Sequence, residues 1–300
     1  MNYEMTRHAL LSHLWLHEPD VDTIARATAE LGLPSAEPTE LASAYADVFL
    51  LNVYPYGTAF TDPTAELNGP DAQWMAARYE AHGYRPPELN SVGAPDHLGL
   101  CLGFLASVGQ DGILPYILNW APVCCLAIER EPSVHPFYCA LAARTRETLL
   151  TSSDDTAHEA QDTLPDSQFL MRNSPLAIQQ SEDAVSLRDI VRFFIAPVRC
   201  GLFLSRSRLG QMAKALGMRL PFGSRFEVAE MLFASAGEAE LVERVLIELE
   251  SEVDVWAAEY RRWAGTYPAW RPFAERWLAR AADATGTLSE MRQMAATIPT

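Results

Sequence analysis

The chain of 300 residues lacks several features that would place it in a common structural class. No apolar run reaches the about 18 residues that a membrane-spanning helix needs, so we expect no membrane span. The first residues, MNYEMTRHALLSHLW, contain no basic segment followed by a long apolar one, and so they predict no secretory signal. There are only 16 glycines and no long alternation of apolar and polar residues, which argues against a β-rich fold.

The standard sequence motifs of enzymes are also missing. The chain contains no G-x-x-x-x-G-K-[ST], no G-x-G-x-x-G after a strand, no G-x-S-x-G and no H-E-x-x-H. We therefore expect no enzymatic activity. The cysteines are odd in number and lie in apolar surroundings, which predicts buried, reduced thiols in a cytoplasmic protein. They are Cys101, Cys124, Cys125, Cys139 and Cys200.

Positive charge is scarce in the first half of the chain. The formal net charge is −16, and residues 1–150 hold 18 acidic residues against 7 arginines. Residues 201–300 are nearly neutral, with 13 acidic and 12 basic residues. An acidic surface repels nucleic acid, so no nucleic-acid partner is expected, whereas it attracts a cationic peptide. The same acidity is also explained by solubility alone.

The apolar residues recur at helical spacing, which predicts an all-α fold. We expect one helical domain over residues 1–150, an acidic linker over 151–185 and a C-terminal helical extension or domain over 186–300. A capping box of Ser224 and Glu227 predicts the start of one C-terminal helix. The predicted helices span 5–17, 20–32, 38–52, 71–82, 96–108, 113–130, 136–150, 186–196, 206–216, 225–236, 238–264 and 272–295.

Two loops stand out between the helices of the first half. The segment 52–70 is rich in proline and aromatic residues, and the segment 83–95 ends at Pro95. Because proline disfavours helical geometry in the residue before it, Asp96 is the expected N-cap of the next helix. Two interpretations of Asp96 and His97 stay open: they cap and pack, or they bind an extended peptide, with the carboxylate receiving an arginine or backbone N–H groups.

The order of motifs in residues 5–150 resembles a known family. It runs from the helix end Tyr45-Ala-Asp-Val-Phe49 through the loop Tyr54-Pro55-Tyr56…Phe60, Glu88, Pro95-Asp96-His97-Leu98…Phe104 and Trp120 to His135-Pro136-Phe137-Tyr138. This order is similar to that of the TorD/DmsD/NarJ-like redox enzyme maturation proteins. Where many members carry glutamates after the Asp-His pair, this chain has Cys101 and Gly103.

The resemblance implies an all-α chaperone of the cytoplasm without a cofactor of its own. Such proteins bind the apo-form of a molybdopterin oxidoreductase of the DMSO reductase superfamily, often at its twin-arginine leader peptide, until the cofactor is inserted. The expected partners are therefore an apo-molybdoenzyme catalytic subunit and its leader. By match of motif, the implied peptide-binding residues are Asp96, His97, Pro95, Tyr45, Phe49, Pro55, Tyr56 and Phe60.

Two other functions remain as alternatives. A metal-dependent enzyme could use His97 with Cys101 and His135 with Cys139, since both pairs are four residues apart and each would share a helix face. Ordinary buried cysteines explain the same residues without a metal. The other alternative is a non-catalytic acidic scaffold.

Overall fold

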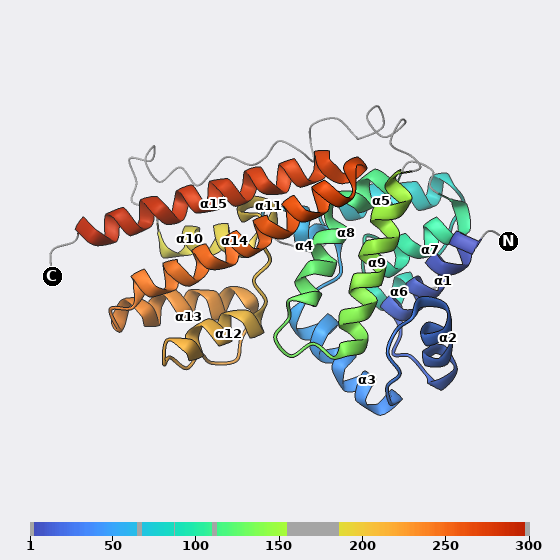
Figure 1. Cartoon of the computed structure of the whole chain (residues 1–300), viewed down its shortest axis with the longest axis horizontal. Coiled ribbons are helices and arrows are strands. Elements are labelled where there is room, and N and C mark those ends of the chain that lie inside the picture. Colours follow the sequence, from blue (N-terminus) through green and yellow to red (C-terminus); the bar gives the residue numbers. More distant parts are fainter. Residues whose placement is uncertain (1–2, 65–67, 87, 110–112, 155–185, 298–300) are drawn as a thin grey trace. The chain divides into compact units, whose positions relative to one another are not determined.

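The structure, a computed structural model, describes residues 3–64, 68–86, 88–109, 113–154 and 186–297. Every regular element in these ranges is a helix, and the one isolated β-bridge among them joins Tyr56 to His97. The prediction of an all-α fold is therefore confirmed (Figure 1). No helix in the described part of the chain combines the length and the apolar character that crossing a membrane requires.

The chain divides into two compact units by its internal contacts. The first comprises Met1–Asp62 and Glu66–Pro165, and the second comprises Pro63–Ala65 and Asp166–Thr300. The helices of the first unit are α1 (Tyr3–Leu16), α2 (Val21–Leu31), α3 (Pro38–Tyr45), the π-helix η1 (Ala46–Asn52), α4 (Gly57–Thr61), α5 (Pro70–Ala81), α6 (Leu89–Val92), α7 (Leu98–Val108), α8 (Leu114–Glu129) and α9 (Pro136–Asp154).

Helix α7 lies at the centre of the first unit and packs closely against α1. A Cβ atom at Gly99 would lie 2.6 Å from the side chain of Leu16, and one at Gly103 would lie 3.0 Å from the Oγ atom of Ser12. The Ser12 hydroxyl donates a hydrogen bond of 2.7 Å to the Gly99 carbonyl. The two helices therefore approach each other at a distance that only glycine permits at these positions.

The predicted helix over 38–52 is not a continuous α-helix. Its α-helical part ends at Tyr45, and residues 46–52 continue as the wider π-helix η1. This change of pitch buries Phe49 but leaves Leu50 61% exposed. The two predicted loops also contain short helices, α4 and α6, which sequence patterns of this length do not reveal.

The second unit is built around a long antiparallel pair of helices (Figure 1). Its elements are α10 (Leu187–Ile195), α11 (Pro197–Cys200), α12 (Arg206–Ala215), α13 (Arg225–Glu238), α14 (Val242–Thr266), the 3₁₀ turn η2 (Pro268–Trp270) and α15 (Arg271–Thr297). The fully buried tryptophans of this unit are Trp256, Trp263, Trp270 and Trp277. The predicted capping box is confirmed at α13, where Ser224 and Glu227 exchange both hydrogen bonds.

The predicted linker over 151–185 is only partly described. Residues 151–154 form the last turn of α9, so this helix extends past its predicted end at residue 150. The remainder of the predicted linker lies outside the described residues. The second unit then begins with a capping box of Ser186 and Asp189 at the start of α10.

Candidate functional site

The Asp96 carboxylate does not cap the helix that follows it, contrary to the sequence-based prediction. Its Oδ2 atom accepts hydrogen bonds from the backbone N–H of Thr58 at 2.7 Å and from the Thr58 hydroxyl at 2.8 Å. Asp96 therefore satisfies the first turn of α4, across 38 residues of sequence. The N-cap of α7 is His97, because α7 begins at Leu98. The side chain of Asp96 is 0% exposed.

His97 is also part of the interior. Its Nδ1 atom accepts the backbone N–H of Gly99 at 3.1 Å, and its ring packs edge-on against Tyr56 with centroids 4.9 Å apart. Burial lowers the pKa of His97 to about 3, so the ring is neutral at physiological pH. Asp96 and His97 thus hold residues 53–57 against the start of α7. Direct contact of these two residues with a peptide stays a prediction.

Two backbone hydrogen bonds complete this junction. The Leu98 N–H donates to the Pro55 carbonyl at 2.8 Å, and the Gly57 N–H donates to the Asp96 carbonyl at 3.0 Å. A Cβ atom at Gly57 would lie 2.1 Å from the Tyr116 hydroxyl, so no larger residue fits there. The predicted residues Pro55, Tyr56, Pro95, Asp96 and His97 are therefore brought together by the fold.

The other predicted aromatic residues lie in the core on either side of this junction. Phe49 packs against Trp15, and its ring centroid lies 4.9 Å from that of Tyr45. The Tyr45 hydroxyl donates to the Trp15 carbonyl at 3.1 Å, and burial raises the pKa of Tyr45 to about 12. Phe60 is 0% exposed and stacks on Trp120. Phe49 and Phe60 are thus buried and Tyr45 is partly exposed; as residues that touch a peptide, all three stay a prediction.

A second buried carboxylate, Asp71 of α5, lies near Asp96. The Thr61 hydroxyl is 2.5 Å from Oδ2 of Asp71 and 2.9 Å from the Gly57 carbonyl. A hydroxyl has one hydrogen to donate, so if Thr61 donates it to Gly57, the contact with Asp71 requires a proton on the carboxyl group. Burial raises the pKa of Asp71 to about 7, with further contributions from the charges of Asp96 and Asp62. Sequence patterns gave no sign of this residue.

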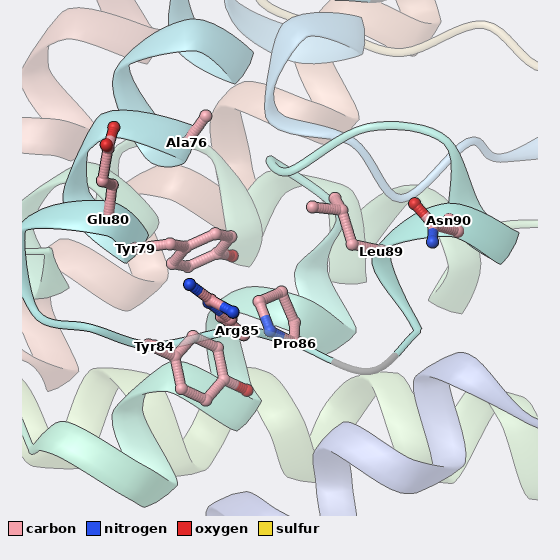
Figure 2. Close-up of a pocket in the computed structure, with 8 residues that line it drawn as sticks. All are labelled: Ala76, Tyr79, Glu80, Tyr84, Arg85, Pro86, Leu89 and Asn90. Carbon is pink, nitrogen blue, oxygen red and sulfur yellow. The ribbon is translucent and has the colours of Figure 1, made fainter.

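An open pocket of about 450 Å³ lies next to this junction, between α5 and α6 (Figure 2). Tyr79 connects the two, because its hydroxyl donates to the Pro95 carbonyl at 2.8 Å while its ring lines the pocket. The side chains that line the pocket are Ala76, Tyr79, Glu80, Tyr84, Arg85, Pro86, Leu89 and Asn90. The sequence analysis missed this set, although Tyr84-Arg85-Pro86 between two helices was the available signal.

The pocket combines an apolar wall with charges of both signs. Tyr79 and Tyr84 pack edge-to-face with ring centroids 5.4 Å apart, and both pack against Phe104. Burial raises the pKa of Tyr84, and the nearby carboxylate of Glu88 raises it further. Glu80 is exposed on the same wall, and the exposed Arg85 also lines the pocket (Figure 2). Such a pocket can accept an apolar side chain and, at its rim, a charged group.

The structure does not assemble the His/Cys set that a metal enzyme would need. His97 and His135 each use Nδ1 to accept a backbone N–H, from Gly99 and Phe137. Among the described residues, no three histidine, cysteine, aspartate or glutamate side chains are grouped so that they could hold a metal ion. Cys101 lies instead against the Tyr79 hydroxyl, at 4.0 Å.

The described part of the chain is all-helical, and the junction and the pocket lie in its first unit. Residues 18–125, which contain the junction and the pocket, match the family model described as "Nitrate reductase delta subunit". This region is therefore similar to that family, in agreement with the resemblance to TorD/DmsD/NarJ-like proteins. The match covers roughly a third of the chain and includes none of the helices of the second unit. Neither a curated protein nor a solved structure matches the chain.

Proposed function

We propose that the protein is a cytoplasmic chaperone, and not an enzyme, for the maturation of a molybdopterin oxidoreductase of the DMSO reductase superfamily. It binds the apo-form of the catalytic subunit, its twin-arginine leader peptide, or both, until the cofactor is inserted. The family match over residues 18–125 supports this role, because the nitrate reductase delta subunit family is a chaperone family for molybdoenzyme maturation. The chaperone needs no cofactor of its own for this role.

The observation that carries the proposal is the pocket beside the Pro95-Asp96-His97 turn. It lies within the family-matched region and offers aromatic and aliphatic surface together with the exposed carboxylate of Glu80. An apolar residue of the leader packs against Tyr84 and Leu89, and a leader arginine lies near Glu80. Asp96 and His97 act as positioning residues, since they hold the wall to which Tyr79 is bonded.

The test is a calorimetric titration of the full chain with a synthetic leader peptide. The peptide is taken from the molybdoenzyme catalytic subunit whose gene neighbours that of this protein. We expect Tyr84→Ala and Leu89→Ala each to weaken binding about tenfold, which corresponds to about 1.4 kcal/mol. Leu50→Ala is the matched control, because Leu50 is exposed and lies in η1 rather than at the pocket.

The outcomes separate the proposal from its alternatives. Equal affinity of all three variants would place the peptide elsewhere on the protein. No binding of either the leader or the co-expressed catalytic subunit would refute the chaperone role and favour an acidic scaffold. One tightly held metal ion per purified chain would instead support the hypothesis of a metal-dependent enzyme.

A further inference from the structure

The second unit buries an arginine without a partner for its charge. Arg280 of α15 is 5% exposed, and its Nη1 atom has no hydrogen-bond partner. It takes part in no ion pair between described residues. Its guanidinium instead lies over the ring of Trp277, 4.4 Å from the ring centroid. Burial lowers the pKa of Arg280 to about 10, which shows how poorly this environment compensates the charge.

Two other partly buried arginines in this chain have carboxylate partners. Arg146 donates two hydrogen bonds of 2.8 Å to Glu129, and Arg208 is paired with the buried Glu252. A cation–π contact is a weaker interaction than the hydration that a buried, unpaired charge loses. The contact with Trp277 therefore does not compensate for burying Arg280.

A second cation lies one helical turn earlier on the same face of α15. Arg276 is half-buried, its Nη1 atom also has no hydrogen-bond partner, and its positive charge further lowers the pKa of Arg280. Two like charges four residues apart on a helix repel each other. An oxyanion that lies between the two guanidinium groups would remove this repulsion and accept hydrogen bonds from both.

The turn that follows α11 holds this part of α15 in place. Gly201 has a φ of 75°, in the left-handed region that favours glycine. A Cβ atom at this position would lie 2.6 Å from the backbone nitrogen of Ala281. The Tyr260 hydroxyl donates to the Gly201 carbonyl at 2.8 Å. Arg280 also acts electrostatically on the buried thiol of Cys200 in the same turn. The close approach of Gly201 to Ala281 therefore fixes the backbone of α15 next to Arg280.

We propose that Arg276 and Arg280 form a binding site for an oxyanion, a carboxylate or phosphate group that a ligand presents to the second unit. The planar guanidinium of Arg280 donates two parallel hydrogen bonds to the anion from the inner end of the site. Arg276, which is less buried, contacts it from the solvent side. This site lies outside the family-matched region and is independent of the peptide pocket.

The test is thermal unfolding of the full chain in sodium chloride, sodium phosphate and sodium acetate at equal ionic strength and pH. Tryptophan fluorescence follows the unfolding, because Trp277 lies under Arg280 and three more of the seven tryptophans lie in the second unit. We expect a higher Tm in phosphate or acetate than in chloride; a response to one salt alone identifies which oxyanion the site takes. Arg280→Met should abolish this response and should not lower the Tm in chloride, because it removes a buried, unpaired charge.

Two further variants make the outcome decisive. Arg276→Met should raise the phosphate or acetate concentration needed for half of the shift about tenfold. Arg271→Met, at an exposed position of the same helix, should respond like the unaltered chain. The proposal is overturned if the Tm is the same in all three salts, if Arg280→Met still responds, or if Arg280→Met unfolds at a lower temperature in chloride.

Discussion

Replacing Asp71 by asparagine should change how the stability of the first unit depends on pH. In the folded chain the pKa of Asp71 is raised from its ordinary value of 3.8 to about 7, chiefly because the carboxyl group is buried. The folded state therefore holds a proton at this site that the unfolded state has already released between these two values. The stability that the folded state gains from the protonated Asp71 is fully present below pH 3.8 and is lost as the pH rises toward 7.

The size of the effect follows from the same two values. Each pKa unit corresponds to about 1.36 kcal/mol, so ionisation of Asp71 costs the folded state about 4 kcal/mol above pH 7. Asp71→Asn keeps the shape and a neutral carbonyl oxygen next to Thr61 but removes the titration. The variant should thus be more stable than the unaltered chain at pH 8 and nearly equal to it at pH 4.

Urea unfolding followed by circular dichroism, at several pH values from 4 to 8, measures this difference. Asp22→Asn is the control, because Asp22 is an exposed residue in the first turn of α2. The difference between Asp71→Asn and the unaltered chain should grow steadily with pH, whereas the control should show no such trend. A constant difference, or one that grows toward low pH, would refute the reasoning from burial and the Thr61 contact.

Three further predictions concern the junction and the peptide. Asp96→Ala should cost about 3 kcal/mol in urea unfolding, because it leaves the buried N–H and hydroxyl of Thr58 without an acceptor; Asp96→Asn, which keeps one, should cost less. A cost near 1 kcal/mol would instead indicate an ordinary helix cap. Gly57→Ala should destabilise the chain by about 2 kcal/mol through its clash with the Tyr116 hydroxyl, and adding Tyr116→Phe should restore part of the loss; equal stability of the single and double variants would rule out this clash. Raising the salt concentration should weaken leader binding through a slower on-rate, and replacing the arginine pair of the leader should remove most of this dependence; an affinity that salt does not change would mean that the acidity serves solubility only.

Helices of both units show which kinds of local structure can be predicted from sequence. Helix α2 could be predicted because Gly32 ends it in the left-handed conformation, and α13 because Ser224 and Glu227 form its capping box. The π-helix η1 could not, because its residues have the same apolar spacing as an α-helix, and the wider turn becomes evident only from the burial of Phe49 and the exposure of Leu50.

The motif Pro95-Asp96-His97-Leu98 shows what can and what cannot be predicted from sequence at the site. The order of motifs around it was enough to find the family resemblance of residues 18–125 and to expect that these residues act together. Motif order could not show that Asp96 accepts the hydrogen bonds of Thr58 in α4. A sequence pattern predicts an N-cap from the residue next to the helix, and Thr58 lies 38 residues from Asp96.

The amino-acid sequence by itself determined the helical class of this protein, most of its helix ends and the family resemblance of residues 18–125, because periodicity, capping residues and motif order are local properties of the chain. Only the tertiary structure decided which groups are buried and which remain open. Burial depends on the packing of segments far apart in sequence, and it places Asp96 and His97 inside, Asp71 at a pKa of about 7, and Tyr84 and Leu89 at an open pocket. The unpaired Arg280 has the same origin, since no local pattern shows that α15 presents it to a tryptophan rather than to a carboxylate.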